Sequence, residues 1–229
     1  MKRILLPAAL VAATLLSGNV LAADLETDAQ KLGYIIGMDI GGSLKQQNAD
    51  IDLDSLFEAI KATYNDQPLA MTPEEAATVR EAFIAKRRAE AEAERDTLAA
   101  DNAAAGDKFL LENRVKEGVQ ITDSGLQYQV IEMGDGPTPA ATDKVTVHYR
   151  GTLLNGEEFD SSYSRGEPVS FALNQVIPGW TEGVQLMPVG SKFMFFIPPD
   201  LGYGPAGGGP IGPNATLIFE VELLGIEED

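Results

Sequence analysis

The residues of this sequence that could do chemistry are mostly aromatic and have few ionisable neighbours. They comprise Tyr149, Phe159, Phe171, Trp180, Tyr203 and Phe219. If strand faces and a helix start turn these rings inward, they could line a hydrophobic hollow that binds an apolar ligand. An ordinary aromatic core would use the same residues in the same pattern. Composition alone therefore leaves both interpretations open.

The sequence also contains conventional catalytic side chains, but a function that depends on them is a weaker interpretation. His148 could pair with Ser161 or Ser162 as in a hydrolase, but strand alternation predicts that His148 faces solvent, and no G-x-S-x-G motif is present. Glu157, Glu158 and Asp160 could supply an acid and a base for glycosyl transfer. Successive strand residues point to opposite faces, however, so Glu158 and Asp160 would share a face only with each other. We expect neither kind of catalysis.

The glycine-rich segment 202–213 could be mistaken for a phosphate-binding loop. It lacks the Gly-Lys-Ser/Thr ending and leads into a strand rather than into a helix. A long surface loop is the simplest interpretation. A loop that holds Tyr203 and Ile211 between glycines nevertheless commonly borders a pocket.

Composition excludes several classes of protein. The 229 residues include 17 basic and 35 acidic ones, a net charge of −18, which repels nucleic acids and anionic lipids. Cysteine is absent and histidine occurs once, so disulfides, thiolate nucleophiles and multi-histidine metal sites are excluded. We expect no metal, no cofactor and no nucleic-acid partner.

A C-terminal antiparallel β domain must position these residues. Val145, Val147 and Tyr149 alternate with polar residues, and 217–223 alternates in the same way. Asn155-Gly156 predicts a type I′ hairpin turn. Further strands are expected at 127–131, 158–160, 169–173 and 192–197, with a short helix at 181–187. The sequence therefore predicts a sheet of five or six strands wrapped around one helix.

The N-terminal half is predicted to be helical. Apolar residues recur at helical spacing over 32–44 and again over 53–64. Two such short helices bury too little surface alone, so we expect them to pack against a second copy of the chain. Thr72-Pro73-Glu74-Glu75 predicts the start of a long helix, which is rich in alanine and charge and has little to bury. This helix would hold the two halves apart.

The first residues have the pattern of a secretory signal. A basic start, Met1-Lys2-Arg3, precedes the apolar stretch 4–16 and small residues up to Ala22. The apolar stretch is shorter than the roughly 20 residues that span a bilayer, and Pro7 interrupts it. We expect cleavage after Ala22, which leaves 15 basic against 35 acidic residues and a net charge of −20. No later segment is predicted to span a membrane.

Several motifs resemble, in order and spacing, those of the FKBP-type peptidyl-prolyl cis/trans isomerases. They are Val145-Thr-Val-His-Tyr149, Gly156-Glu-Glu-Phe-Asp-Ser-Ser162, Val176-Ile-Pro-Gly-Trp180, Gly190-Ser-Lys, Pro199-Asp-Leu-Gly-Tyr203-Gly and Asn214-Ala-Thr-Leu-Ile-Phe-Glu-Val-Glu-Leu223. The signal sequence, the segment Leu32-Gly-Tyr-Ile-Ile-Gly37 and the long helix extend the resemblance to the secreted macrophage-infectivity-potentiator and FkpA-like subgroup. The resemblance covers the whole mature chain.

The resemblance implies a set of site residues. Asp160, Tyr203 and Ile177 would be catalytic, with the Ile177 N–H and the Tyr203 hydroxyl donating hydrogen bonds to substrate carbonyls. Trp180 would form the floor of a proline pocket. The substrate-binding set would comprise Tyr149, Phe159, Arg165, Phe171, Val176, Trp180, Ile211 and Phe219, with Arg165 paired to Asp160. Val169 stands where many family members carry a phenylalanine at the pocket edge, and the glycine near Gly209 stands where some carry a histidine. The resemblance therefore leaves open which residue before proline is preferred.

The resemblance also implies an α+β fold and a division of the chain. Residues 1–22 would be the signal peptide, 23–71 a helical dimerisation domain, 72–118 a connecting helix and 119–229 the isomerase domain. The protein would be a periplasmic homodimer, with outer-membrane association as an alternative, and it would act on proline-containing unfolded or partly folded polypeptides. Macrolide inhibitors are candidate small ligands. The competing function is a non-enzymatic holdase chaperone.

Overall fold

The computed structural model describes residues 25–46 and 50–227. The predicted signal peptide and its cleavage point lie outside these ranges. Contacts divide the chain into two compact units, and the division falls between Thr72 and Pro73. The long helix therefore belongs to the same unit as the sheet. Within the described ranges, no helix is both long enough and apolar enough to cross a bilayer.

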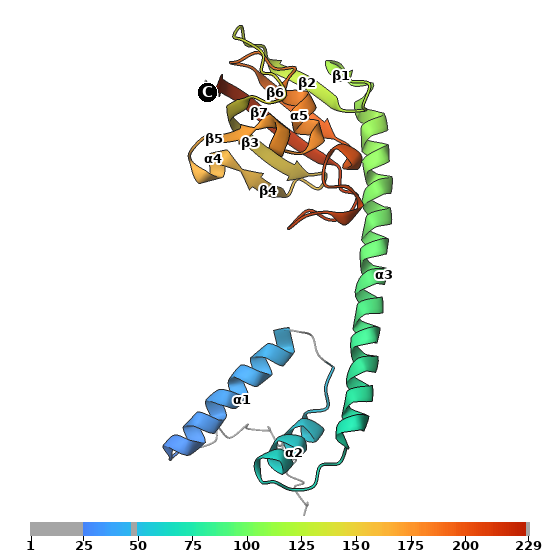
Figure 1. The fold of residues 1–229 in the computed structure, drawn as a ribbon, viewed down its shortest axis with the longest axis vertical. Coiled ribbons are helices and arrows are strands. Elements are labelled where there is room, and N and C mark those ends of the chain that lie inside the picture. The colour runs from blue at the N-terminus through green and yellow to red at the C-terminus, as the bar shows by residue number, and fades with distance from the viewer. Residues whose placement is uncertain (1–24, 47–49, 228–229) are drawn as a thin grey trace, which may run out of the picture. The chain divides into compact units, whose positions relative to one another are not determined.

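The N-terminal unit contains α1 (Asp28–Gln46) and α2 (Leu53–Tyr64), at the two stretches of predicted helical spacing (Figure 1). Asp52 caps α2, because its side chain accepts a 2.7 Å hydrogen bond from the Ser55 N–H. Neither helix contains a buried residue. The apolar stripes of both helices are consequently exposed in the single chain.

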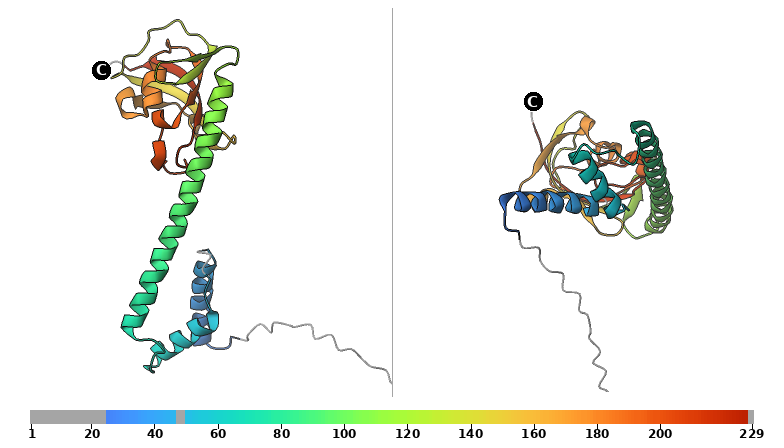
Figure 2. Two further views of the ribbon diagram at one scale, coloured as in Figure 1. Left: turned by 90° about the vertical axis from the view of Figure 1, so that its right-hand side faces the viewer. Right: turned by 90° about the horizontal axis from the view of Figure 1, so that it is seen from below.

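The C-terminal unit begins with α3 (Pro73–Asn113), whose first residue is the proline predicted to start it. As the sequence predicts, little of this helix is buried, and its buried residues are Gly106 and Asn113. Its C-terminal half nevertheless packs along the sheet domain (Figures 1 and 2). A Cβ at Gly106 would lie 2.3 Å from the Thr216 hydroxyl oxygen, so only glycine allows this approach. Asn113 is buried and donates a 3.0 Å hydrogen bond to Gln127.

The sheet has seven strands, one more than the upper limit that the sequence predicted, and all of its pairings are antiparallel. The strand missed is β1, because three residues are too few to show alternation. The order is β1-β2-β6-β7-β3-β4, and β5 also pairs with β3. The strands are β1 (Val119–Ile121), β2 (Gln127–Glu132), β3 (Lys144–Leu153), β4 (Glu158–Ser161), β5 (Val169–Ala172), β6 (Lys192–Ile197) and β7 (Leu217–Ile226).

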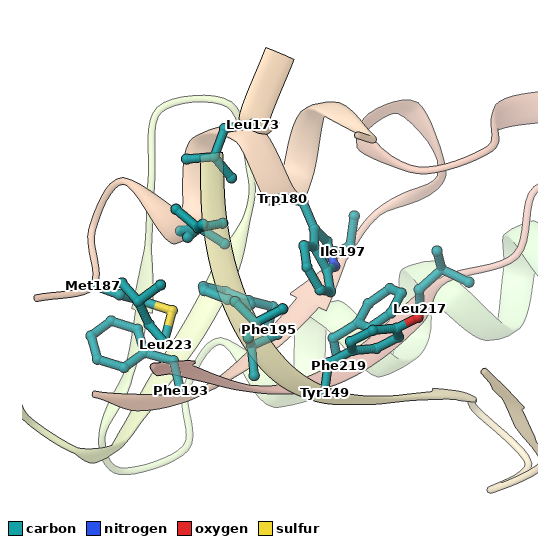
Figure 3. Close-up of a cluster of buried hydrophobic side chains, with 14 of the residues drawn as sticks. Tyr149, Leu173, Trp180, Met187, Phe193, Phe195, Ile197, Leu217, Phe219 and Leu223 are labelled. Carbon is teal, nitrogen blue, oxygen red and sulfur yellow. The ribbon is translucent and has the colours of Figure 1, made fainter. Parts of the chain in front are cut away.

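The core fills the concave side of the sheet under α5 (Pro178–Val184) (Figures 1 and 3). This helix starts three residues before the predicted 181–187, because Pro178 occupies its first turn. A Cβ at Gly179 would lie 2.7 Å from the Ile197 side chain, and one at Gly183 would lie 2.7 Å from the Phe195 ring. The two glycines therefore let α5 approach β6 closely. The predicted α+β class is confirmed.

The connection between β3 and β4 differs from the predicted type I′ turn. Such a turn needs positive φ at both central residues, but only Gly156, with φ of 85°, has it. Hydrogen bonds from Leu153 N–H to Glu157 O and from Gly156 N–H to Leu153 O close a three-residue loop instead. Three shorter elements complete the neighbourhood of the site: α4 (Ser162–Arg165) and the 3-10 turns η1 (Leu173–Gln175) and η3 (Gly204–Ala206).

Candidate functional site

A cavity of about 490 Å³ opens between the sheet, α5 and the loop after β6. Its lining is mostly aromatic and aliphatic, with one charged residue. The lining residues are Tyr149, Asp160, Phe171, Gln175, Val176, Ile177, Trp180, Tyr203 and Phe219. Eight of the eleven residues predicted for the site line this cavity.

Strands β3 and β7 and helix α5 bring three rings together at the base of the cavity. The Trp180 ring centroid lies 5.2 Å from that of Tyr149 and 5.3 Å from that of Phe219, both edge-to-face (Figure 3). Such contacts are favourable because the positive edge of one ring faces the negative face of another. All three side chains are almost fully buried. The base of the cavity is therefore rigid and apolar.

A glycine on β3 makes room for this arrangement. Gly151 pairs with Phe219 on β7, and a Cβ at Gly151 would lie 2.7 Å from the Phe219 ring and 2.6 Å from the Phe159 ring. Phe159 packs edge-to-face on Phe219, with centroids 5.4 Å apart. Phe159 thus supports the wall of the cavity from behind rather than lining it.

The polar side of the cavity is a network of three side chains. The Tyr149 hydroxyl donates a 2.5 Å hydrogen bond to Asp160 Oδ2, and Arg165 donates to Asp160 Oδ1 at 2.5 Å and to the Tyr149 hydroxyl at 2.8 Å. Arg165 therefore sits behind Asp160 instead of lining the cavity. Its charge neutralises the carboxylate, which leaves an apolar cavity with one fixed, compensated dipole on its wall.

The network shifts the pKa values of its members. Burial raises the pKa of Tyr149 to about 12, and the hydrogen bond to Asp160 adds to this shift. Burial opposes ionisation of Asp160, but the hydrogen bonds from Tyr149 and Arg165 outweigh it and lower the pKa of that carboxyl. The hydrogen bond to Asp160 raises the pKa of Arg165. At neutral pH the network therefore holds a carboxylate, a guanidinium and a neutral phenol.

Backbone and hydroxyl donors stand at the rim. Ile177 is the residue before α5, and within residues 25–46 and 50–227 its N–H has no backbone acceptor. Tyr203 is 42% exposed and lines the cavity, to which it adds a phenolic hydroxyl. The cavity thus offers donors at its edge above an apolar floor.

Ile211 and Gln175 depart from the predicted site. Ile211, predicted to border the pocket, is 6% exposed and packs in the hydrophobic core cluster instead of lining the cavity. Gln175, in the turn η1, lines the cavity but was not predicted. An isolated polar residue in a short turn belongs to no periodic pattern, so the sequence held no signal for it.

His148 and Ser162 do meet, contrary to the prediction that the histidine simply faces solvent. His148 is half-buried, its ring stacks on Tyr163, and its Nδ1 lies 2.9 Å from the Ser162 hydroxyl. Ser162 is fully buried, and its hydroxyl accepts a 2.7 Å hydrogen bond from the Tyr149 N–H. A buried hydroxyl bound to the backbone is inaccessible to a substrate, so the pair supports β3 rather than forming a hydrolase site.

In the described part of the chain, no group of three histidine, cysteine, aspartate or glutamate side chains is placed to hold a metal ion. The chemistry available at the cavity is therefore apolar binding, hydrogen bonding and exclusion of water.

Comparisons with known proteins find similar sequences over most of the chain. Residues 136–224 match the family model described as FKBP-type peptidyl-prolyl cis-trans isomerase, and residues 29–130 match the model of the domain amino terminal to it. The FKBP-type peptidyl-prolyl cis-trans isomerase FkpA of Aeromonas hydrophila is 48% identical over 90% of this chain and 79% of its own length. The outer membrane protein MIP of Legionella longbeachae is 44% identical over 90% of this chain and 89% of its own.

A solved structure is similar over most of the chain as well. The crystal structure of FkpA from Escherichia coli superposes with a TM-score of 0.73 at 40% sequence identity. The superposition covers 89% of this chain and 98% of the other.

Proposed function

We propose, from the premise that the chain belongs to the FKBP-type peptidyl-prolyl cis-trans isomerases, that the aromatic cavity is where it binds proline and rotates the preceding peptide bond. The observation that carries this proposal is the combination of a buried aromatic base with the Ile177 N–H and the Tyr203 hydroxyl beside the cavity. A proline ring fits over apolar rings, and the carbonyls on either side of it can accept hydrogen bonds from the rim.

Rotation about an Xaa-Pro bond requires no covalent chemistry. Amide resonance opposes it with a barrier of about 18–20 kcal/mol, and no bond is made or broken. Water stabilises the planar, charge-separated amide, so a dry cavity raises the free energy of the ground state relative to the twisted form. If the cavity binds the twisted amide better than the planar one by about 4 kcal/mol, rotation is accelerated on the order of 10³-fold.

Each part of the cavity has a role in this proposal. Trp180 and Phe219 hold the proline ring, and the Ile177 N–H and the Tyr203 hydroxyl bind substrate carbonyls. Asp160, compensated by Arg165, presents a fixed dipole to the rotating carbonyl without drawing water into the cavity. The charge stays on Asp160 throughout because its pKa is lowered.

The proposed substrates are proline-containing segments of unfolded or partly folded exported proteins. The N-terminal sequence pattern supports export to the periplasm, and a relative carries the name outer membrane protein MIP. A net charge of −18 repels anionic surfaces and acidic chains, which favours neutral and basic substrate segments.

A homodimer through α1 and α2 is proposed on the exposure of both helices. Leu32, Ile36 and Phe57 are 60%, 50% and 59% exposed, and exposed apolar patches of this kind mark surfaces that bind a partner. Gly33, Gly37 and Gly41 recur every four residues on α1, and a Cβ at any of them meets nothing within 4 Å. Such a stripe allows a second helix to approach closely. The partner we propose is a second copy of the chain.

A chaperone activity is the second candidate function. Exposed apolar residues of α1 and α2 that remain accessible in a dimer could hold unfolded chains, and linking two such units raises the effective concentration of binding sites. Suppression of aggregation by the full chain distinguishes this function from isomerisation, because it does not require the aromatic cavity.

The test of the proposed site is an NMR exchange assay on a short Xaa-Pro peptide with the full chain, Asp160→Val and Tyr203→Phe. We expect each substitution to lower the exchange rate roughly ten- to hundredfold, since a hydrogen bond made mainly in the twisted state is worth about 1–3 kcal/mol. Aggregation of an unfolded protein is measured in parallel. Unchanged exchange in both variants would place catalysis outside this cavity.

A further inference from the structure

The loop of residues 204–214 between β6 and β7 has few side chains with which to hold itself in place. Glycine and proline make up eight of its eleven residues, and only Ala206, Ile211 and Asn214 carry other side chains. Backbone hydrogen bonds define its shape. The Asn214 N–H donates to Gly204 O at 3.0 Å, and Gly208 and Ile211 exchange two hydrogen bonds of 2.9 Å. These bonds close the loop on itself, but they do not fix where it lies relative to the cavity.

Helix α3 holds the loop from outside at both of its arms. Arg95 Nη2 donates a 3.1 Å hydrogen bond to Pro205 O on the first arm. Asn102 Nδ2 donates a 2.8 Å hydrogen bond to Pro213 O on the second. Asn214 Nδ2 returns a 3.4 Å hydrogen bond to Ala99 O in the helix. The three bonds span two turns of α3, so they fix both the position and the tilt of the loop.

The loop also touches α3 directly at a glycine. A Cβ at Gly212 would lie 3.1 Å from Asn102 Nδ2 and 3.4 Å from the Leu98 side chain. Beside this contact lies a hollow of about 370 Å³ lined by α3, the β3–β4 hairpin and the loop. Ile211 anchors the middle of the loop in the hydrophobic core cluster, and the polar tethers hold its two arms where packing against α3 is incomplete.

The same loop adjoins the cavity on its other side. A Cβ at Gly208 would lie 2.9 Å from Tyr203 Cδ1 and 3.3 Å from Cε1, so the loop backbone approaches the Tyr203 ring closely. Tyr203 lines the cavity. A displacement of the loop of a fraction of an ångström therefore either presses on this ring or frees it.

We propose that Arg95 and Asn102 of the long helix are positioning residues for the isomerase site: by tethering loop 204–214 they set the place of the Tyr203 ring and so determine which residue before proline the cavity accepts. The inference rests on the proposed binding of the substrate at this cavity. When the Tyr203 ring is held in one place, the cavity discriminates between small and bulky side chains on the residue before proline. When the ring can shift, the cavity accommodates both.

The test uses the full chain and five single variants. Arg95→Met and Asn102→Asp each remove a donor to the loop and keep most of the side-chain volume. Arg88→Met removes an arginine two turns earlier on the same helix, and Ala104→Asp adds the same charge as Asn102→Asp at an exposed helix position. Arg95→Lys keeps a donor and serves as the conservative variant. Thermal unfolding is measured for all of them, and assays are run where every variant is folded.

Two readouts separate positioning from mere stabilisation. The first is kcat/KM on two tetrapeptides that differ only in alanine or leucine before proline. We expect the ratio of the two values to move toward one by roughly three- to tenfold in Arg95→Met and Asn102→Asp, the loss that about one hydrogen bond accounts for. The ratio should stay at the wild-type value in Arg88→Met and Ala104→Asp, and Arg95→Lys should restore most of it.

The second readout is independent of activity. In protein labelled with ¹⁵N-glycine, the amide signals of Gly207, Gly208 and Gly209 should shift or broaden in Arg95→Met and Asn102→Asp but not in the two control variants. Tyr203→Phe is assayed alongside. If Tyr203→Phe lowers activity while the tether variants Arg95→Met and Asn102→Asp match the two control variants in both readouts, the inference is overturned and the proposed site stands. If Tyr203→Phe and the tether variants all leave peptide isomerisation unchanged, the proposed site fails and the inference fails with it.

Discussion

The Tyr149 hydroxyl donates a 2.5 Å hydrogen bond to Asp160 Oδ2, and this bond joins the aromatic base of the cavity to its charged wall. The two residues lie on neighbouring strands, β3 and β4. Arg165, at the end of α4, closes the arrangement from behind. Three segments of the chain therefore determine one orientation of the Asp160 carboxylate.

Tyr149→Phe should lower both the free energy of unfolding and the rate of peptide isomerisation. The substitution keeps the ring and removes the donor to Asp160. A hydrogen bond to a charged group is worth about 1.5–3 kcal/mol, but partial exposure of Asp160 brings the expected loss of unfolding free energy to about 1–2 kcal/mol. Denaturant unfolding and peptide isomerisation measure both effects.

Tyr128→Phe is the matched control for this substitution. Its hydroxyl donates to the uncharged Gln120 side chain at 2.9 Å, outside the cavity. It should change activity by less than about twofold. Equal losses of activity in Tyr128→Phe and Tyr149→Phe would mean that the hydroxyl of Tyr149 supports the fold without acting on the site.

The pH dependence of stability should have an acid and an alkaline limb. Because the pKa of Asp160 is lowered by folding, its contribution is complete above the ordinary value of about 3.9 and disappears as the pH falls through the lower folded value. Because the pKa of Tyr149 is raised to about 12, the unfolded chain ionises first above about pH 10, and stability falls from there. Unfolding free energies measured from pH 3 to 11 check both limbs.

Peptide isomerisation should be constant from about pH 5 to 9, because the network keeps one protonation state throughout. Asp160→Asn should abolish the part of the decrease in unfolding free energy at acid pH that protonation of Asp160 causes. An acid limb unchanged in Asp160→Asn would contradict the assignment, and a step in activity near neutrality would point to another ionisable group. Repeating the profile on His148→Gln tests the single histidine of the chain.

Gly37→Ala should distinguish a free α1 from one packed against a second copy. In an unpartnered helix, alanine in place of glycine stabilises by about 1 kcal/mol, and a Cβ at Gly37 meets nothing within 4 Å. In the proposed dimer the added methyl separates the helices. We expect light scattering to give twice the chain mass for residues 23–229, and a dimer dissociation constant raised at least tenfold in Gly37→Ala.

The position of the mature N-terminus is a further expectation. Intact-mass measurement of periplasmic protein should give a chain that starts at Ala23 or Asp24, as the small residues before this point predict. A mass that includes residues 1–22 would instead indicate an anchored form.

Periodic elements with one buried face could be predicted from the sequence. Strand β6 lies at the predicted 192–197, and the alternation of Val145, Val147 and Tyr149 matches their burial. The prediction was wrong where local chemistry overrides the pattern. The hairpin at Asn155 has a longer loop than the Asn-Gly signal implies, and α5 begins at Pro178, a helix-start signal that was available in the sequence.

The packing of α3 on the sheet domain was missed for a different reason. Its C-terminal half has no continuous apolar stripe. Attachment depends on Gly106, on Asn113, on hydrogen bonds such as that from Gln127 Nε2 to Leu110 O, and on one ring contact, between Phe109 and Phe196 at 5.8 Å. Polar and small-residue contacts leave no periodicity. Gly106 was the available signal, because a glycine in the middle of a helix costs about 1 kcal/mol and so calls for a packing reason.

The central claim is that the aromatic cavity, with the Tyr203 hydroxyl at its edge and Asp160 on its wall, rotates the peptide bond. The most direct measurement is the rate of cis/trans exchange of a short Xaa-Pro peptide, measured by NMR with wild-type protein, Trp180→Ala, Tyr203→Phe and Asp160→Val at a temperature where each variant is folded. The account predicts acceleration by the wild type and a loss of roughly ten- to hundredfold in Tyr203→Phe and Asp160→Val, with at least as large a loss in Trp180→Ala. Wild-type exchange rates in all three variants would contradict it.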